Sequence, residues 1–378
     1  MYSIEDLRKK IDQIDCELLP LFLKRMECSL HIAEYKRANN LPILDKGRED
    51  EILNSKMAKV SHELKIPVRD FFAGIMKISR CSQTKALSNN MDTPTFLNGF
   101  DNTPMKQDPI VSYQGIPGAN SETALIKFFG ETCKKINVMT FSEVLDAVDA
   151  NTADFGIIPI ENSFTGSISA NLDLLVKHNL YIVGEVEVDI DHCLVGLKGA
   201  SLDDIKKVYS HEQGYMQCRE FFAKYPKMVF EPYHNTAMAA KMVSGLGDRS
   251  VAAVSDRRAA ELYGLDILAE NISNAVGNVT RFVIVAKKGY ISSKNNKTSI
   301  LFTLPNESGS LNSVLSIFAD SGINLLKIQS RPSHDGSFQY MFFVDFEGNL
   351  LKQNIQGIMA QLSHASASLK ILGCYQGC

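Results

Sequence analysis

Apolar positions in residues 1–90 recur with the period of an α-helix. From Ser3 onward they stand mostly three or four residues apart, at Leu7, Ile11, Ile14, Leu18, Leu21, Cys28 and Ile32. This spacing predicts one long helix with a buried apolar stripe, capped by Ser3 with Asp6, and with Pro20 as a point of bending. Arg25 and Lys36 fall on the same stripe. Because a buried charge is costly without a partner, either a helix interface or an anionic ligand has to meet them.

Two further helices are predicted before residue 90. One begins near Asp45, whose carboxylate can cap it, and the other runs from Pro67 to about Ser88. Ser79 and Gln83 stand four residues apart on the third helix, so they share a face. The following stretch, 86–108, is rich in Ser, Asn, Thr and Pro and predicts a linker, which we assign to residues 91–107.

Strands alternate with helices from residue 108 onward, which predicts an α/β domain. The expected strands are 109–113, 154–160, 180–188, 207–209, 250–255 and 279–285, and the expected helices include 172–177, 235–243 and 257–263. The first strand is followed by a Gly-rich turn and a helix that Ser121 is expected to cap, an arrangement suited to binding an anion. The glycines match neither a dinucleotide motif nor a P-loop, so a nucleotide site is not predicted.

Polar groups stand at the ends of three of these apolar strands. They are Glu161, Asn162 and Ser163 after the second strand, Ser210 and His211 after the fourth, and Thr280 and Arg281 at the entry of the last. Such groups either satisfy neighbouring backbone or face a ligand, because ligands bind at strand ends in α/β sheets. A hydrolase triad is excluded at Ser210, since no nucleophile-elbow motif is present and adjacent residues cannot form a triad.

The last ninety residues predict a third fold. After a polar stretch at 292–297, the expected order is strand 299–304, helix 310–319, strand 324–329, strand 338–346, helix 351–363 and strand 368–375. This βαββαβ order is that of a ferredoxin-like α+β unit.

Composition narrows the class of protein. A chain of 378 residues with 45% hydrophobic and 22% charged residues predicts two or three globular domains. The net charge of −3 does not favour nucleic acid or a membrane surface, and no apolar run reaches the ~20 residues that span a bilayer. The eight cysteines and eight histidines show no metal-ligand spacing. We therefore expect a cytoplasmic protein with no metal and no cofactor.

Residues 1–90 resemble the all-helical chorismate mutases. The resemblance is carried by Arg8, Arg25, Lys36, Asp45, Arg48, Glu49, Ser79 and Gln83. It implies that chorismate, a dianion, rearranges to prephenate by a Claisen shift without a nucleophile or proton transfer, so the site must hold a compact conformer and stabilise charge on the ether oxygen. By this resemblance Arg8 and Arg25 bind carboxylates, Lys36 and Gln83 donate to the ether oxygen, Glu49 holds the substrate hydroxyl, and Asp45, Arg48 and Ser79 complete the pocket.

Helix geometry separates Arg8 from the other cations. Arg25 and Lys36 are eleven residues apart, hence on one face and about 16 Å apart. Arg8 lies about 42 Å from Lys36 along a straight helix and cannot enter the same pocket. If Arg8 is used, it has to come from an antiparallel partner chain, which predicts an intertwined homodimer or higher homo-oligomer.

Residues 108–287 resemble the prephenate dehydratases, whose fold has two α/β lobes with the substrate between them. Matching stretches are 156–163 with Gly166-Ser167, Ser210-His211 with Gln213, Gln217 and Cys218, Asn235-Thr236-Ala237, and Asn278-Val279-Thr280-Arg281-Phe282. Glu212 departs from the family's usual proline and Asn120 from its frequent aromatic residue. Both departures concern substrate contacts rather than the reaction.

The resemblance implies that prephenate loses its ring carboxylate and ring hydroxyl to give phenylpyruvate. Thr280 would donate a proton or hydrogen bond to the departing hydroxide, with Glu161 as the rival proton source. Arg281 would hold a carboxylate or only brace the cleft. The substrate-binding set is Ser121, Asn162, Ser163, Ser210, Gln217, Thr280 and Arg281.

Residues 298–378 resemble the ACT regulatory domains, which bind phenylalanine at a dimer interface. The expected effector residues are Gly309, Ser310, Leu311, Gln329 and Ser330. Gln329 replaces the family's usual glutamate, which leaves the strength and identity of the effector open because a neutral amide pairs less strongly with an ammonium group. A dimerisation module without a ligand remains the alternative.

The three resemblances together predict a multidomain, bifunctional enzyme of phenylalanine biosynthesis that is inhibited by L-phenylalanine. The alternatives are a dehydratase that prefers arogenate and a non-catalytic aromatic-acid binding or regulatory protein. The strand at 279–285 leads into the linker at Ser292, so it is a candidate route from the effector domain to the cleft.

Overall fold

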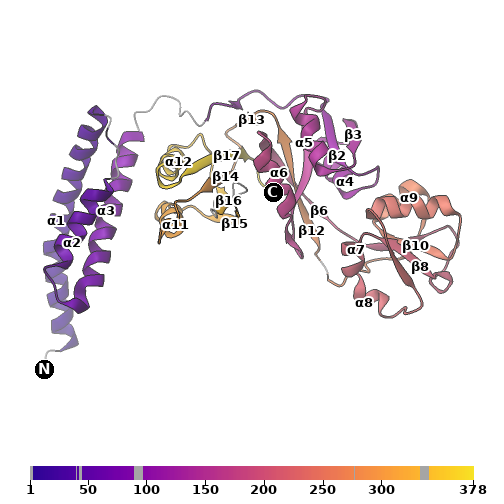
Figure 1. The fold of residues 1–378 in the computed structure, drawn as a ribbon, viewed down its shortest axis with the longest axis horizontal. Coiled ribbons are helices and arrows are strands. Elements are labelled where there is room, and N and C mark those ends of the chain that lie inside the picture. Colours follow the sequence, from indigo (N-terminus) through magenta and orange to yellow (C-terminus); the bar gives the residue numbers. More distant parts are fainter. Residues whose placement is uncertain (1–2, 40, 42–44, 89–96, 276, 333–339) are drawn as a thin grey trace. The chain divides into compact units, whose positions relative to one another are not determined.

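The computed structural model describes residues 3–39, 41, 45–88, 97–275, 277–332 and 340–378 (Figure 1). Contacts divide the chain into two compact units, one of residues 1–98, 302–342 and 350–369, and one of 99–301, 343–349 and 370–378. Residues 91–96 of the predicted linker, and the start of the strand expected from 338, lie outside the described residues. No helix in the described part of the chain is long and apolar enough to cross a membrane.

The three helices predicted at the start of the chain are confirmed. They are α1 (Ile4–Ala38), α2 (Lys46–Met57) and α3 (Lys65–Ser88), with a short 3-10 turn η1 (His62–Leu64) before α3. Ser3 and Asp6 form the expected capping box, and Asp45 Oδ1 accepts from the Arg48 amide at 3.0 Å. Pro20 lies inside α1 without ending it.

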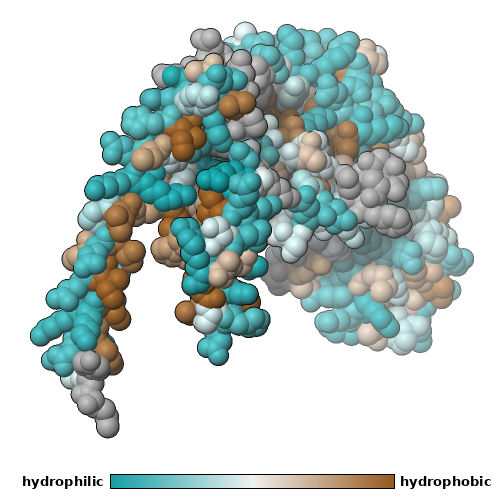
Figure 2. All heavy atoms as spheres, turned by 60° about the vertical axis from the view of Figure 1, so that its left-hand side comes forward, coloured by the Kyte–Doolittle hydropathy of each residue, from teal (hydrophilic) through white to brown (hydrophobic). Residues whose placement is uncertain are grey.

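The apolar stripe of α1, expected to be buried, is exposed in the single chain. Leu7, Ile11 and Ile14 are 45%, 57% and 55% exposed, and Ser29 and Ala33 are the described residues of α1 that are buried. Figure 2 shows hydrophobic side chains along one side of the arm that ends at the chain's first residues. The expectation was wrong for one chain because α3 covers only the second half of α1, where Arg25 and Ser29 contact it.

The second unit begins with a mixed sheet of order β3-β2-β4-β12-β6. Its strands are β2 (Ile110–Gln114), β3 (Lys134–Val138), β4 (Phe155–Asn162), β6 (Tyr181–Asp189) and β12 (Val279–Ala286), with β5 (Gly166–Ser167) paired to β4. Strand β12 runs antiparallel between β4 and β6. Strand β12 therefore has a paired neighbour on each side, and its residues from Thr280 to Ala286 are buried.

The two faces of this sheet belong to different cores. Helices α5 (Phe141–Asp149) and α6 (Ser169–Lys177) pack with Val283 and Val285, whereas α4 (Asn120–Phe129) packs with Phe282 and Ile284. Because side chains alternate along a strand, the odd-numbered residues of β12 face α5 and α6 and the even-numbered ones face α4. The sequence analysis missed β3 and α5, although Thr140 and Glu143 form a capping box before α5.

The start of α4 differs from the prediction. Ala119 is the N-cap residue and makes no side-chain cap, while Ser121 is buried in the first turn, so the expected serine cap was wrong. The Gly118 amide donates to Glu122 Oε2 at 2.7 Å, and Lys135 pairs with Glu122 at 3.2 Å. A carboxylate of the chain itself therefore occupies the end of α4 where we expected an external anion.

The second lobe carries a sheet of order β11-β7-β10-β8-β9. Its strands are β7 (Cys193–Gly196), β8 (Lys207–Ser210), β9 (Val229–Pro232), β10 (Val251–Ser255) and β11 (Asp266–Ala269), and its helices are α7 (Glu212–Met216), α8 (Arg219–Phe222), α9 (Thr236–Leu246) and α10 (Arg257–Tyr263). The helix expected over 235–243 is α9, and Asn235 caps it, its Oδ1 accepting from the Met238 amide at 2.7 Å. The chain passes between the lobes twice, after β6 and before β12.

The predicted βαββαβ order at the end of the chain is confirmed. Its elements are β14 (Lys297–Thr303), α11 (Ser310–Asp320), β15 (Leu325–Pro332), β16 (Tyr340–Glu347), α12 (Gln353–Ala365) and β17 (Ser368–Tyr375), in a sheet of order β15-β16-β14-β17. Short strands β1 (Phe100–Asp101) and β13 (Gly289–Tyr290) pair in parallel before it. Phe343, Leu372 and Tyr375 join the same core as α5 and α6.

Close packing of β17 on β6 gives a first prediction. A Cβ atom added at Gly373 would overlap the backbone carbonyl oxygen of Ile182 and lie 2.9 Å from the carbon of the same carbonyl group. Gly373→Ala should therefore lower the free energy of unfolding, by about 1–3 kcal/mol. Gly245→Ala in α9 is the matched control, because no atom lies within 4 Å of the added Cβ and it should be neutral or stabilising by up to about 1 kcal/mol. Urea unfolding of both variants would measure this, and equal stabilities would contradict the packing described.

Candidate functional sites

The helices of the first unit enclose a cavity of about 370 Å³. Among its lining residues are seven of the eight predicted mutase residues, namely Arg25, Lys36, Asp45, Arg48, Glu49, Ser79 and Gln83. Arg8 is not among the described residues that line it, as expected from its distance along α1. The periodicity of three separate helices thus brings these side chains to one place.

Polar contacts already order part of this cavity. Arg25 Nη1 donates to Ser79 Oγ at 2.5 Å, and Ser79 Oγ donates to the Ile75 carbonyl at 2.9 Å. Glu49 forms an ion pair with Arg80, a lining residue that the sequence analysis missed. Its place on α3, next to Ser79 and three residues before Gln83, was the signal that could have revealed it.

The side-chain amide of Gln83, which lines the cavity, is hydrogen bonded at only one of its two ends among the described residues. Its Nε2 donates to Ser29 Oγ at 2.7 Å, while Oε1 is buried and has no hydrogen-bond partner among the described residues. Because the Ser29 hydroxyl can also donate, a half-turn of the amide would keep that bond and leave Nε2 as the free donor. The side chain is therefore anchored at one end and available at the other.

In the second unit, the residues of interest meet where β4 pairs with β12. Thr280 stands opposite Asn162, and both side chains are buried. Asn162 Nδ2 donates to Thr280 Oγ1 at 3.0 Å and to Asn278 Oδ1 at 2.6 Å. Since Nδ2 can only donate, the Thr280 oxygen accepts this bond and its own proton remains available for another group.

The second lobe reaches the same point through Gln217. Gln217 Oε1 accepts from Asn278 Nδ2 at 3.2 Å and lies 2.9 Å from His192 Nε2. Burial lowers the pKa of His192 below its ordinary value, although Gln217 and Asp191 act in the opposite direction. The sequence analysis missed His192 and Asn278, and only the inclusion of Asn278 in the 278–282 stretch hinted at one of them.

Two serines of the predicted set differ in their surroundings. Ser163 Oγ is engaged by backbone, accepting from the Val279 amide at 3.0 Å and donating to the Gly277 carbonyl at 3.1 Å. Ser210 Oγ is buried and has no hydrogen-bond partner in the described part of the chain. Ser163 thus holds the backbone at the start of β12, whereas the Ser210 hydroxyl remains available for a hydrogen bond to a ligand.

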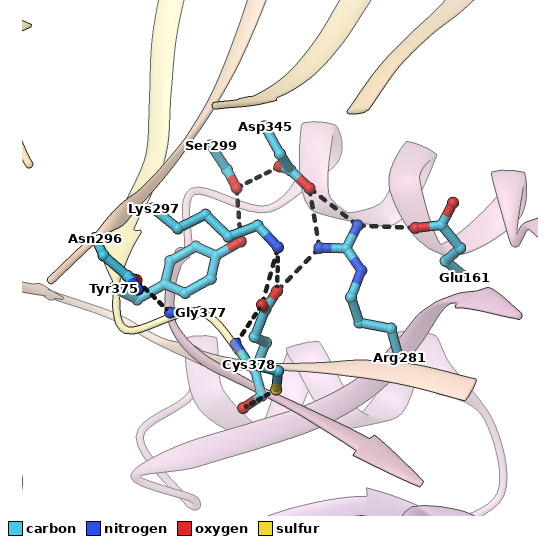
Figure 3. Close-up of polar contacts among 10 residues, drawn as sticks. Glu161, Arg281, Asn296, Lys297, Ser299, Asp345, Tyr375, Gly377 and Cys378 are labelled. Carbon is cyan, nitrogen blue, oxygen red and sulfur yellow. Dashed lines mark hydrogen bonds and ion pairs between the residues drawn. The ribbon is translucent and has the colours of Figure 1, made fainter. Parts of the chain in front are cut away.

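Arg281 does not face the same side of the sheet as Thr280. Its guanidinium contacts three carboxylates, Glu185 and Asp345 at 2.9 Å and Glu161 at 3.0 Å, and its side chain is 9% exposed (Figure 3). The expectation that Arg281 binds a substrate carboxylate was therefore wrong, because protein carboxylates already occupy the guanidinium. Of the two roles considered for it, the structure supports bracing.

The first unit has a smaller cavity of about 150 Å³, and two of the five predicted effector residues line it. Ser310 and Leu311 line it, and Gly309 caps α11 with a φ of 88°, a conformation that favours glycine. Gln329 and Ser330 lie on β15, an edge strand of the sheet. In the described residues, no group of three or more side chains is arranged to hold a metal ion.

Comparison with known proteins matches each part of the chain to a family. Residues 7–84 match the chorismate mutase type II family, 111–290 the prephenate dehydratase family and 298–353 the ACT domain family. The chain is 32% identical to a bifunctional chorismate mutase/prephenate dehydratase of Buchnera aphidicola subsp. Schizaphis graminum (strain Sg), over 97% of this chain and 95% of the relative. It is 41% identical to arogenate dehydratase/prephenate dehydratase 1, chloroplastic, of Arabidopsis thaliana, over 70% and 71% respectively.

A solved structure supports the same assignment. The prephenate dehydratase of Arthrobacter aurescens, determined in complex with L-Phe, has 30% sequence identity and a TM-score of 0.66 over 71% of this chain and 90% of that one. The fold and the two polar sites define an enzyme with separate helical and α/β catalytic regions. The chain belongs to the bifunctional chorismate mutase/prephenate dehydratase family, so it converts chorismate to prephenate and prephenate to phenylpyruvate in phenylalanine biosynthesis.

The buried histidine gives a pH prediction. The pKa of His192 is lowered in the folded state, so the His192 imidazole binds a proton more readily in the unfolded chain. The free energy of unfolding should therefore decrease as the pH falls through the ordinary histidine pKa of about 6.5. His192→Gln keeps a donor for Gln217 but cannot titrate. Between pH 7.5 and 5.5 the wild type should lose more stability than this variant, by up to about 1.4 kcal/mol for each unit of the pKa difference. Urea midpoints at both pH values measure it, with exposed His62→Gln as control; identical pH dependence in wild type and His192→Gln would refute it.

Proposed function

We propose that the cavity of the first unit is the chorismate mutase site and that its cations bind the substrate dianion. Arg25, Lys36, Arg48 and Arg80 all line it. A Claisen rearrangement requires a held conformer and stabilisation of charge on the ether oxygen, and converging donors supply both. The observation that carries the proposal is the convergence of seven predicted residues from three helices on one cavity.

Within this site we assign Lys36 and Gln83 to the ether oxygen. Gln83 is held by Ser29 at one end, and the other end of its amide is buried without a partner among the described residues. A bound substrate would satisfy it. Arg25, fixed by Ser79, would bind a carboxylate, and Glu49, held by Arg80, would accept from the substrate hydroxyl.

Arg8 completes the site only if a second chain supplies it. It stands on the exposed part of α1, about 42 Å from Lys36 along the helix. The exposed apolar stripe around it, with Ile11 and Ile14 more than half exposed, supports burial against the same helix of another copy. We therefore propose an antiparallel homodimer in which each chain completes its partner's mutase site.

Subunit mixing tests this proposal. Arg8→Ala and Lys36→Ala should each abolish most mutase activity in homodimers. If the sites are shared, a heterodimer of the two variants contains one intact site, so refolding an equimolar mixture should restore about one quarter of wild-type mutase activity. Mixing Lys36→Ala with Gln83→Ala, both changes in the same cavity, is the control and should restore none. A mixture of Arg8→Ala and Lys36→Ala that stays inactive would contradict the shared site.

For the dehydratase we propose that Thr280 donates to the departing hydroxide of prephenate. Asn162 fixes the Thr280 oxygen as an acceptor, which leaves the hydroxyl proton for the substrate. Glu161 instead forms an ion pair with Arg281, and a carboxylate engaged in this way acts as an acceptor rather than a proton source. This contrast favours Thr280 over Glu161.

The neighbouring polar groups have positioning and binding roles in this proposal. Asn162 and Asn278 fix the entry of β12, and Gln217 links them to the second lobe. Ser210, at the end of β8, and Ser121, in the first turn of α4, are both buried. They would contact the substrate or shape its binding site. Ser163 holds the crossover backbone.

Two substitutions of Thr280 distinguish a hydroxyl role from a packing role. Thr280→Ser retains the hydroxyl and should retain most dehydratase activity, whereas Thr280→Val keeps the shape and should lower kcat by about 10²–10⁴-fold. Prephenate binding, followed by calorimetry, should be preserved in both variants. Mutase activity of the same chains is the internal control, and a Val variant with wild-type kcat would refute the role.

We further propose that L-phenylalanine binds beside α11 and inhibits the enzyme. The cavity lined by Ser310 and Leu311 and the L-Phe complex of the Arthrobacter aurescens relative support this site. The Arabidopsis thaliana relative's name includes arogenate, so a preference for arogenate remains the second candidate for the dehydratase substrate. A cytoplasmic location stays a prediction from the sequence.

A further inference from the structure

Strand β12 carries two functions on opposite faces. Thr280 contacts Asn162 on one side, and the next residue, Arg281, extends to the other side together with the odd-numbered residues that face α5, α6 and Tyr375. The same pairing occurs on β4, where Asn162 stands opposite Thr280 and Glu161 opposite Arg281. Thr280 and Asn162 are thus each adjacent in the chain to a residue of a charged cluster on the other face of the sheet.

The charged cluster joins the dehydratase sheet to the ACT sheet. Asp345 Oδ2, on β16, accepts from both Nη1 and Nη2 of Arg281 at 2.9 Å, and Asp345 itself is fully buried. Glu185, on β6, accepts from Arg281 at 2.9 Å and from Lys297 at 2.8 Å. Figure 3 shows the Arg281 guanidinium between Glu161 on one side and Asp345 on the other.

A second set of contacts fixes Asp345. Its Oδ1 accepts from Ser299 Oγ at 2.5 Å, and the Tyr375 hydroxyl lies 2.8 Å from Ser299 Oγ. Burial and the neighbouring Asp345 and Glu185 charges raise the pKa of Tyr375 well above its ordinary value, so the phenol stays protonated and donates to Ser299. The carboxylate of Asp345, on β16, is therefore held by Ser299 of β14, and Ser299 is held in turn by Tyr375 of β17.

The ionisation of the cluster is also fixed. Burial alone would lower the pKa of Arg281, but Asp345 and Glu185 outweigh it and raise this pKa above its ordinary value. Burial alone would raise the pKa of Glu185, but Lys297 and Arg281 keep it below the ordinary value. Arg281 and Glu185 therefore remain charged, and a fixed charge in a buried site holds its hydrogen-bond partners in defined positions.

We propose that Asp345 is a positioning residue of the dehydratase: by holding Arg281 from behind the sheet, it fixes the place of Thr280 on the front. The ACT sheet is then a part of the active dehydratase and not only a sensor attached to it. This inference rests on the proposed role of Thr280. It adds Asp345, a residue outside the dehydratase region, to the residues on which the dehydratase site depends.

The test uses the full chain and the variant Asp345→Asn, which keeps the shape and removes the charge. Because small misplacement of a catalytic group is costly, dehydratase kcat should fall by about tenfold or more, with KM for prephenate within about twofold. Glu347→Gln, two residues further on the same strand and exposed, is the matched control and should leave kcat unchanged. Mutase activity of the Asp345→Asn chain should also be unchanged. Wild-type kcat in Asp345→Asn would overturn the proposal.

A double-mutant cycle separates positioning from general destabilisation. If Asp345 acts through Arg281, adding Asp345→Asn to Arg281→Lys should cost much less kcat than it costs alone. Additive losses would contradict the proposal. If Asp345→Asn does not fold, Ser299→Ala provides the test, because it removes only the hydroxyl that holds Asp345. This variant should also lower dehydratase kcat. An unchanged kcat in Ser299→Ala would count against the proposal. Thr280→Val tests the catalytic hydroxyl independently, so failure here leaves that role intact.

Discussion

One buried guanidinium connects most of the second unit. Arg281 is surrounded by Glu161, Glu185 and Asp345, and removing such charges from water costs on the order of several kcal/mol per ion. The arrangement is stable only because the partners are themselves satisfied, Glu185 by Lys297 and Asp345 by Ser299. As a result β4, β6 and β12 of the dehydratase and β14 and β16 of the ACT sheet meet at one polar joint. A change at any of these strands has to be accommodated by the others.

The two active sites place different demands on the fold. The mutase rearrangement needs converging donors and a held conformer, so three helices around one cavity suffice. The cations of that cavity come from all three helices, with Arg25 and Lys36 on α1, Arg48 on α2 and Arg80 on α3. The dehydratase needs a hydroxyl donor aimed at a leaving group. A central strand with neighbours on both sides fixes such a donor more closely than a surface loop would, since its backbone is hydrogen bonded along both edges.

Local patterns in the sequence were sufficient for most of the elements, although not for β3 and α5, and for much of the sites. Apolar spacing with a period of 3.6 residues predicted α1, the Asp45 cap predicted α2, and the family resemblance predicted the residues of the mutase cavity. Contacts between distant segments were not predictable. The sequence around Asp345 and Glu185 does not indicate that they contact Arg281. A carboxylate in an apolar strand has the same pattern as the solvent-facing polar residue of an ordinary alternating strand. For the same reason both roles of Arg281, binding a substrate carboxylate and bracing the cleft, stayed open from the sequence, although strand alternation places its side chain on the face opposite Thr280.

The same strand β16 carries Tyr340 and Phe342, which line the proposed effector cavity, and Asp345 three residues beyond Phe342. The central claim is that this strand and β12 are mechanically joined through Arg281. Hydrogen–deuterium exchange of the full chain, followed at the amides of residues 279–286 with and without saturating L-phenylalanine, tests it most directly. The account predicts that the ligand changes the exchange of β12 as well as that of β16. Changes confined to the ACT sheet, with β12 exchanging at the same rate in both states, would contradict it.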